Sequence, residues 1–137
     1  FRAAFRRRRC LVVADGFYEW QARDGAKQPY HIALADGGPM AFAGLWERWG
    51  GDDTLETFTI LTTDASPALA TIHQRMPVIL APSHQSVWLG VEDPGLLAGL
   101  LGAGDGVDLV ARAVSRHVND PRHDDADCLA PEDQLPR

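Results

Sequence analysis

Cysteines and long apolar runs are what this sequence has least of. Its 137 residues include only 2 cysteines, Cys10 and Cys128, which are too few for a disulfide scaffold. Apolar runs such as Leu11 to Ala14 fall far short of the ~20 residues that a membrane helix needs. We also recognise no hydrophobic stretch typical of a secretion signal. We therefore expect neither a secreted nor a membrane-associated protein, and we favour a reducing, cytoplasmic setting.

Several common site motifs are absent as well. The C-terminal region is rich in potential metal ligands, namely His117, His123, Asp124, Asp125, Asp127 and Cys128. Their spacing matches no CxxC, HExxH or EF-hand pattern, so we expect no bound metal. Asp64, Ser66 and His73 are near one another in sequence, but no GxSxG elbow supports a serine hydrolase. No glycine-rich phosphate loop is present, so we expect no cofactor.

Charge is unevenly spread along the chain. The net charge of -6 argues against a protein that coats nucleic acid nonspecifically, yet five arginines lie in the first nine positions. A ligand responds to the local field, which salt screens within ~10 Å. Arg8 and Arg9 are therefore candidates for contacts with DNA phosphates. The alternative is a solvated basic face, which is the more common outcome for a charge run.

The spacing of turn signals predicts one mainly antiparallel β domain with a few short helices, in the α+β class. Its size allows a core without disulfide or metal support. The predicted strands are 11–20 with a break at Asp15-Gly16, 30–35, a hairpin of 40–49 and 55–63, then 78–81 and 108–118. The predicted helices begin at Ser66-Pro67, Ser83 and Asp93-Pro94. Residues 1–119 form the predicted domain, and 120–137 an acidic, proline-containing tail that wraps the surface or is disordered.

The segment Phe17-Tyr18-Glu19-Trp20 places one carboxylate among three aromatic side chains. Partial burial beside Phe17 and Trp20 favours the protonated form of Glu19, which suits general acid and base work. On a strand, Glu19 shares a face with Phe17, and Tyr18 shares the other with Trp20. Tyr18 and Trp20 are either core residues or a platform for stacking unpaired bases. An ordinary strand with an exposed glutamate is the simpler alternative for Glu19.

The segment from His73 to Pro77, with sequence HQRMP, is the second candidate site. At the end of a predicted helix, His73 lies near carbonyl groups that favour its charged form. The turn before Pro77 lets Arg75 project away from the helix. A structural or solvent-facing His73 remains the alternative.

Four segments taken together resemble the SRAP family, the SOS-response-associated peptidase domain proteins. They are RRCLVVADGFYEW at 8–20, FAGLWE at 42–47, FTILTT at 58–63 and HQRMPVIL at 73–80. The resemblance runs from the first residues to about Asn119. One departure is Val13, where the family usually has proline.

The resemblance implies one α+β domain around a barrel-like core that binds single-stranded DNA and traps abasic sites covalently. The family's nucleophile is an N-terminal cysteine exposed when the initiator methionine is removed; its amine forms a Schiff base and its thiol then closes a thiazolidine. Glu19 matches the family's glutamate, which moves protons at that amine and assists methionine removal. His73 matches the histidine that promotes sugar ring opening and assists reversal. Arg75 matches a phosphate contact, and Trp20 a tryptophan beside the DNA.

This chain lacks that nucleophile, because neither Cys10 nor Cys128 carries a free α-amine. We therefore expect a partial SRAP domain, its C-terminal part, which alone does not crosslink DNA. With an upstream half restored, we expect a monomeric bacterial protein of the nucleoid with peptidase and crosslinking activity, and lyase activity as a further option. A noncovalent single-stranded DNA-binding module is the first alternative. A peptidase acting on other proteins is the second.

Overall fold

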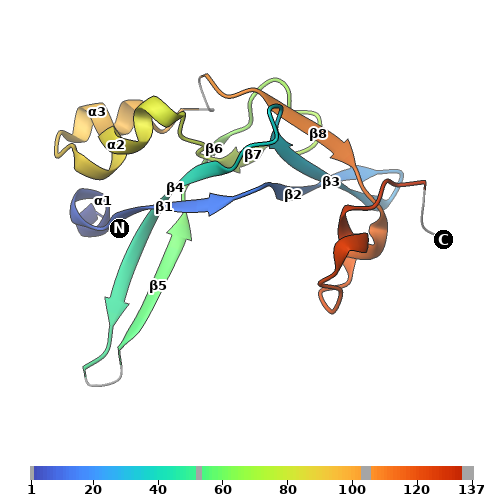
Figure 1. Ribbon diagram of the computed structural model, residues 1–137, viewed down its shortest axis with the longest axis horizontal. Helices are drawn as coiled ribbons and strands as arrows, with labels where there is room; N and C mark the ends of the chain where they lie inside the picture. The colour runs from blue at the N-terminus through green and yellow to red at the C-terminus, as the bar shows by residue number, and fades with distance from the viewer. Residues whose placement is uncertain (1, 52–53, 103–105, 134–137) are drawn as a thin grey trace.

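The computed structural model describes residues 2–51, 54–102 and 106–133 as antiparallel sheets flanked by short helices (Figure 1). The strands are β1 (Arg9–Ala14), β2 (Phe17–Arg23), β3 (Ala26–Leu34), β4 (Met40–Trp49), β5 (Leu55–Ile60), β6 (Thr62–Asp64), β7 (Arg75–Pro77) and β8 (Leu109–Ala113). The helices are α1 (Arg2–Arg7), α2 (Pro82–Gly90), α3 (Pro94–Gly99) and the single 3-10 turns η1 (Arg116–Asn119) and η2 (Ala126–Leu129). The predicted α+β class is confirmed. No helix within these ranges is long and apolar enough to cross a bilayer.

Strands β1, β4 and β5 form one three-stranded sheet. β1 pairs with β4 as far as Leu45, which lies opposite Arg9, and β5 pairs with β4 from Gly44 to Trp49. Because the pairing of β1 with β4 ends at Leu45, the part of β4 beyond Leu45 pairs with β5 alone. These outer ends of β4 and β5 project from the body as a long ribbon (Figure 1). The predicted hairpin is confirmed for β4 and β5, whereas the end of the predicted strand 55–63 lies in β6, which pairs with β7.

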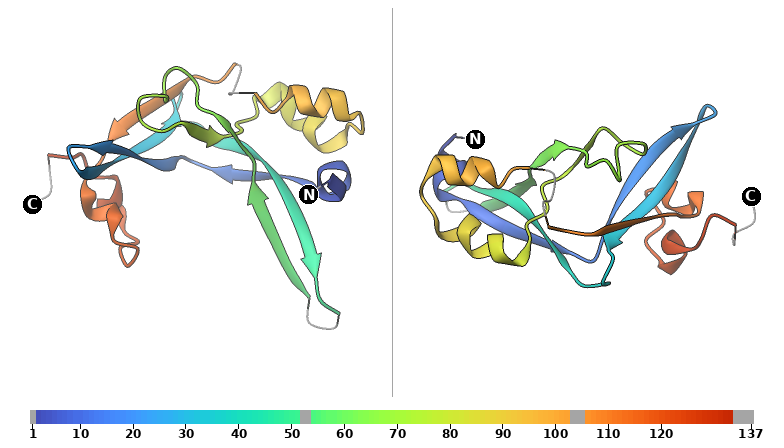
Figure 2. Two further views of the ribbon diagram at one scale, coloured as in Figure 1. Left: turned by 180° about the vertical axis from the view of Figure 1, so that it is seen from behind. Right: turned by 90° about the horizontal axis from the view of Figure 1, so that it is seen from above.

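The dipeptide Asp15-Gly16 carries the chain from this sheet to a second one of order β2-β3-β8. Figure 2 shows β1 and β2 as one long blue ribbon running from α1 toward the C-terminal segment. A Cβ on Gly16 would lie 2.2 Å from Nε2 of His31 and 2.8 Å from the carbonyl oxygen of Ile32. Glycine is therefore required where β2 begins, and the predicted break is confirmed.

Two clusters of buried side chains hold these elements together. One lies against α1, α2 and α3 around Trp88, whose Nε1 donates to the Cys10 carbonyl at 3.0 Å. The other joins β3, β4 and β7 through Ile32, Phe42 and Met76. The second cluster also fixes the segment between β6 and β7, from which part of the candidate site comes.

The sheets do not close into a barrel within the described residues. They remain three separate sheets, β1-β4-β5, β2-β3-β8 and the pair β6-β7. A closed barrel needs every strand to be paired on both sides, whereas β2 and β5 are edge strands here. The predicted barrel-like core is thus corrected to open sheets joined by apolar clusters.

The prediction of a helix that begins at Ser66-Pro67 is wrong, because the chain forms turns there. The Leu69 amide donates to the Ser66 carbonyl at 2.9 Å, and the His73 amide to the Leu69 carbonyl at 3.1 Å. The segment is too short to offset helix nucleation, and two of its residues, Thr71 and Ile72, are β-branched. The outcome is a tight loop that presents His73 at its end.

Other element boundaries also differ from prediction. α1 was not predicted, because only Ala4 is buried on it and its arginines hide the apolar spacing. α2 begins without the predicted serine cap, since no side chain caps its first turn. The α3 prediction is confirmed, with Asp93 accepting from the Gly95 amide at 2.7 Å. The predicted strand 78–81 forms only an isolated bridge, Phe42↔Ile79.

The C-terminal segment turns back onto the second sheet. The predicted strand 108–118 is too long, because β8 ends at Ala113 and η1 follows. The Ser115 amide donates to the Ala130 carbonyl at 2.8 Å, and Val114 bridges Pro131. Residues 120–133 are thereby held beside the ends of β2 and β3 (Figure 1).

Candidate functional site

Strand β2 presents different chemistry on its two faces, as alternation along a strand requires. Phe17 lies on one face and packs edge-on against Phe42 at 5.8 Å between ring centroids. On the same face, Gln21 Nε2 donates to the Thr71 carbonyl at 2.7 Å. Glu19 lies between Phe17 and Gln21, so its carboxylate faces the loop between β6 and β7.

The structure brings Glu19 and His73 together across 54 residues of sequence. Glu19 Oε2 lies 3.7 Å from His73 Nδ1, with side chains 22% and 47% exposed respectively. This separation is too long for a hydrogen bond but short enough for an ion pair when the imidazole is protonated. The two groups therefore form an acid-base pair that solvent and a ligand can reach.

The backbone of Arg75 sets the orientation of the His73 ring. Nδ1 of His73 lies 3.1 Å from the Arg75 amide nitrogen and 3.0 Å from the Arg75 carbonyl oxygen. An unprotonated Nδ1 accepts from the Arg75 amide, and a protonated Nδ1 donates to the Arg75 carbonyl. The site thus accommodates both protonation states of the ring without moving it.

The Arg75 side chain is held on the surface beside this pair. It leaves β7 toward β6, where Nη1 donates to Asp64 Oδ1 at 2.6 Å and Nη2 to the Thr62 carbonyl at 2.7 Å. Met76, the next residue, is buried, so β7 is anchored while Arg75 stays half exposed. Our sequence reasoning missed Asp64 and Thr62 as partners; the only signal for them was their place on an adjacent strand.

Tyr18 and Trp20 lie on the opposite face of β2 from Glu19. Their rings are tilted at a centroid distance of 6.3 Å. Trp20 Nε1 donates to Asn119 Oδ1 at 2.7 Å, and Tyr18 Oη to the Cys128 carbonyl at 3.4 Å. Burial, followed by the nearby Cys128 and Asp15, raises the pKa of Tyr18. The C-terminal segment therefore engages the polar atoms of both rings.

A shallow depression of about 290 Å³ lies beside Trp20 and is also lined by Lys27 and Asn119. It joins an aromatic face to a cationic side chain, which suits a nucleotide base and its phosphate. It lies on the Trp20 face of β2 and not beside Glu19.

Arg9 anchors helices in this structure. Its guanidinium donates to the carbonyls of Phe5, Arg6, Trp88 and Val91 at 2.5 to 2.7 Å. A phosphate contact by Arg9 would break some of these bonds. Arg8 pairs with Glu47 of β4, with Nη2 2.7 Å from Oε2. Their role in DNA binding stays a prediction.

The structure therefore unites three of the predicted site residues and separates the others. Glu19, His73 and Arg75 form one contiguous group. Tyr18 and Trp20 occupy the reverse face of β2, and Arg8 and Arg9 lie where α1, β1 and β4 meet.

Relatives of known description match most of this chain. The chain is 40% identical over 141 residues to the Bacillus subtilis abasic site processing protein YoaM, covering 96% of this chain and 62% of that protein. It is 33% identical to the abasic site processing protein HMCES of Gallus gallus, covering 90% of this chain and 44% of that one. The chain thus spans about three-fifths of the length of the bacterial relative.

Solved structures agree with the fold. A crystal structure of a Bacteroides thetaiotaomicron protein superposes with a TM-score of 0.85 at 27% identity, covering 96% of this chain and 60% of that one. One from Bordetella bronchiseptica gives a TM-score of 0.75 at 31% identity. The family model described as SOS response associated peptidase (SRAP) matches residues 1–121. A match over that much of the sequence shows that this chain belongs to the SRAP family.

Proposed function

We propose that this chain supplies the acid-base groups and a DNA-contact surface for processing abasic sites in single-stranded DNA. The observation that carries the proposal is the approach of Glu19 Oε2 to His73 Nδ1 at 3.7 Å. The names of the relatives YoaM and HMCES, both abasic site processing proteins, support the substrate class.

The proposed chemistry is condensation of an amine with the ring-opened sugar aldehyde. The amine adds to the aldehyde carbon, and the resulting carbinolamine loses its hydroxyl as water when an acid protonates it. Glu19 first accepts a proton from the ammonium group, which frees the amine to attack. Glu19 then donates a proton to the carbinolamine hydroxyl, which leaves as water. His73 assists ring opening by moving the proton of the sugar hydroxyl.

The proposed crosslink is completed by a thiol on the same residue as the amine. The thiol sulfur adds to the imine carbon and its proton goes to the nitrogen, which closes a thiazolidine. An aminothiol held beside the imine has a large effective concentration. This chain does not carry such a residue, so we assign the nucleophile to an N-terminal cysteine of a longer protein, with Glu19 also assisting removal of its initiator methionine.

The DNA contacts of the proposal lie on β7, on the Trp20 face of β2 and where α1, β1 and β4 meet. Arg75 offers a phosphate contact beside the Glu19–His73 pair. The remaining candidates share a cationic or aromatic side chain: Arg8, Arg9, Tyr18 and Trp20. A single-stranded DNA that contacts both Arg75 and Trp20 would have to cross the outer edge of β2. Among the described residues, no other β-strand pairs with that edge.

An external aminothiol provides the test with this chain. The 137-residue protein alone should form no covalent adduct with an abasic single-stranded oligonucleotide on a denaturing gel. Free cysteine added to the mixture should form its thiazolidine with the oligonucleotide faster than without protein, as measured by mass spectrometry. Glu19→Gln and His73→Gln should remove most of this acceleration, and Glu56→Gln, at an exposed position of β5, should not.

Binding measured by fluorescence anisotropy separates the outcomes. Equal acceleration by wild type and Glu19→Gln would contradict the acid-base assignment. Binding of the oligonucleotide without any acceleration would favour a noncovalent single-stranded DNA-binding module. A covalent adduct of the chain alone would show that our assignment of the nucleophile is wrong.

A further inference from the structure

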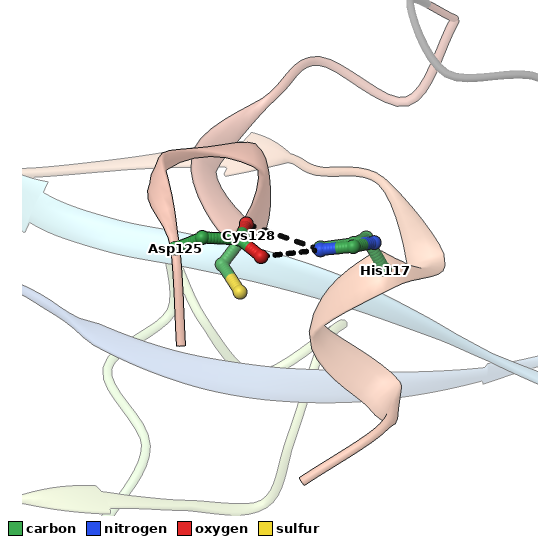
Figure 3. A group of neighbouring side chains, drawn as sticks. All are labelled: His117, Asp125 and Cys128. Carbon is green, nitrogen blue, oxygen red and sulfur yellow. Dashed lines mark hydrogen bonds and ion pairs between the residues drawn. The ribbon is translucent and has the colours of Figure 1, made fainter. Parts of the chain in front are cut away.

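A second cluster of reactive side chains lies in the C-terminal segment, away from Glu19 and His73. His117 comes from η1, Asp125 directly precedes η2, and Cys128 lies within η2. One ligand atom of each, a ring nitrogen, a carboxylate oxygen and the sulfur, lies within 4.8 Å of the other two. Figure 3 shows the three side chains converging from the two 3-10 turns.

The donor set is the one that borderline divalent cations prefer. Zn²⁺ binds imidazole nitrogen and carboxylate oxygen at ~2.0 to 2.2 Å and thiolate sulfur at ~2.3 Å, which places tetrahedral ligands ~3.3 to 3.8 Å apart. His117 Nε2 is already 3.1 Å from both carboxylate oxygens of Asp125. A thiolate and a carboxylate together balance the charge of a divalent ion. The three ligand atoms, all within 4.8 Å of one another, are therefore close to the spacing that such an ion requires.

We propose that His117, Asp125 and Cys128 bind one divalent cation of the zinc class, with water in the fourth position. Binding replaces the hydrogen bond between His117 and Asp125 by two bonds to the metal. The Cys128 thiol gives up its hydrogen bond to the His123 carbonyl and loses its proton to solvent, and His117 coordinates through the lone pair of a neutral ring.

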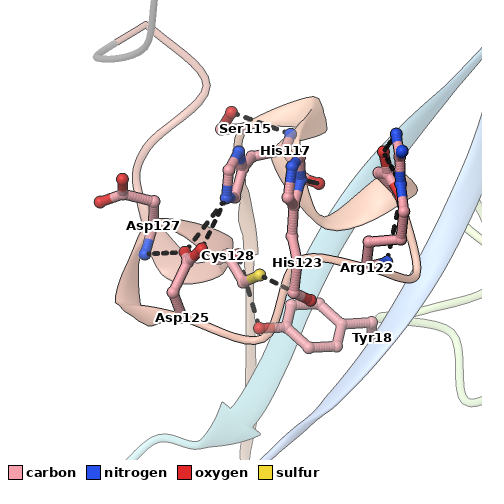
Figure 4. A network of polar contacts seen from close by, with 9 residues as sticks. Tyr18, Ser115, His117, Arg122, His123, Asp125, Asp127 and Cys128 are labelled. Atoms are coloured by element: carbon pink, nitrogen blue, oxygen red, sulfur yellow. Dashed lines mark hydrogen bonds and ion pairs between the residues drawn. The ribbon is translucent and has the colours of Figure 1, made fainter.

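Outer contacts hold the proposed ligands in place. The Ser115 hydroxyl accepts from the His117 amide at 3.1 Å, and Asp125 Oδ1 accepts from the Asp127 amide at 3.0 Å. The rings of His117 and His123 stack in parallel at 3.6 Å (Figure 4). Such contacts fix ligand orientation in metal sites and contribute to affinity.

The proposed ion has a structural role in the fold. Cys128 is 7% exposed, and its carbonyl accepts from Tyr18, so the ion would tie η1 and η2 to β2. Asn119, at the end of η1, accepts a hydrogen bond from Nε1 of Trp20. The site thus stabilises the face of β2 that bears Tyr18 and Trp20. Its ligand spacing, H-x7-D-x2-C, matches no common motif, which is why the sequence led us to expect no metal.

Titration of the reduced 137-residue chain with Zn²⁺ and Co²⁺ tests the site. We expect one ion per chain, a rise in melting temperature with Zn²⁺, and a thiolate-to-cobalt charge-transfer band with Co²⁺. Cys128→Ser should abolish the band, and His117→Ala should lower affinity by about tenfold or more. Cys10→Ser and His84→Ala are matched controls and should leave both readouts unchanged.

Asp125→Asn keeps the side-chain shape and guards against loss of folding, which circular dichroism checks for each variant. It should bind the ion more weakly while remaining folded. A folded wild-type chain without the cobalt-thiolate band would overturn the proposal. So would an unchanged band in Cys128→Ser, or the loss of the band in Cys10→Ser.

Discussion

Arg75 and Asp64 lie directly opposite each other on β7 and β6, and Arg75 Nη1 donates to Asp64 Oδ1 at 2.6 Å. Their side chains are 48% and 91% exposed. An ion pair this accessible contributes little to stability, because water solvates both charges well when they separate. In the function proposed above, a DNA phosphate would take the place of Asp64 on Arg75 at small cost.

Arg75→Gln should weaken binding of single-stranded DNA and reduce its salt dependence. Loss of one phosphate contact lowers the slope of log K against log salt concentration by about 0.7. Fluorescence anisotropy across a salt series measures this slope. Arg23→Gln, an exposed arginine at the end of β2, is the control and should have a smaller effect.

Asp64→Asn should have the opposite effect from Arg75→Gln. It removes a carboxylate that repels phosphate and competes for the guanidinium, so affinity for single-stranded DNA should rise. The same titration measures it. An unchanged affinity in both variants would exclude Arg75 as a phosphate contact in this chain.

Arg9→Met should destabilise the fold more than it affects DNA binding by the folded chain. The guanidinium of Arg9 satisfies carbonyls of α1 and of the end of α2, including Phe5 and Val91. Hydrogen bonds of a charged group contribute ~1.5 to 3 kcal/mol each, and partner carbonyls here can partly rehydrate. We expect a loss of about 2 to 4 kcal/mol in urea unfolding.

The control for Arg9 is Arg6→Gln on the exposed side of α1. Its guanidinium is exposed, and its loss should change the free energy of unfolding by less than about 0.5 kcal/mol. If Arg9→Met left stability intact and abolished DNA binding, Arg9 would be a phosphate contact after all.

Local pattern was sufficient for much of the sheet structure and for the faces of β2. Alternation placed Glu19 opposite Tyr18, and Asp15-Gly16 marked the change of sheet. The meeting of Glu19 with His73 depends on long-range packing of Met76 and Leu69 in the second apolar cluster, which no local signal records.

Arginine-rich segments were the hardest to interpret from sequence. A guanidinium can donate to phosphate oxygens or to a group of carbonyls, and only the fold shows that Arg9 donates to carbonyls. The sequence pattern did not indicate the short helix α1, for a related reason. Its buried surface comes mainly from Ala4 and Phe5, too little to produce a helical apolar period.

Stability should fall as the pH is lowered because of His31. Burial, and then the charge of Arg112, lower the pKa of His31 from 6.5, against a smaller opposing effect of Asp15. Its buried Nδ1 has no hydrogen-bond partner among the described residues. Below pH 6.5, His31 binds a proton more readily in the unfolded chain than in the folded chain. The contribution of neutral His31 to folding stability is therefore complete above pH 6.5 and is lost as the pH falls through the lowered pKa of the folded state.

Urea unfolding between pH 7.5 and 5.5 measures this dependence. His31→Gln should flatten it relative to wild type, and Arg112→Gln should reduce it, because one cause of the lowered pKa is removed. The comparison uses differences between pH values, so a change in overall stability of either variant does not affect it. Identical pH dependence in wild type and His31→Gln would contradict the assignment.

Gly16→Ala should destabilise the chain by about 1 to 3 kcal/mol, the cost of overpacking a filled site. The new Cβ would lie 2.2 Å from His31 Nε2 and 2.8 Å from the Ile32 carbonyl oxygen. His31→Ala removes the first clash but not the second, so the double variant should recover only part of the loss in a thermodynamic cycle. Gly90→Ala, with nothing within 4 Å of its Cβ, is the matched control and should be close to neutral.

Gly16 sets the start of β2, and Glu19 follows three residues later on the same strand, so we expect a displacement at Gly16 to shift Glu19 as well. Acceleration of the aminothiol reaction should therefore fall together with stability in Gly16→Ala but not in Gly90→Ala.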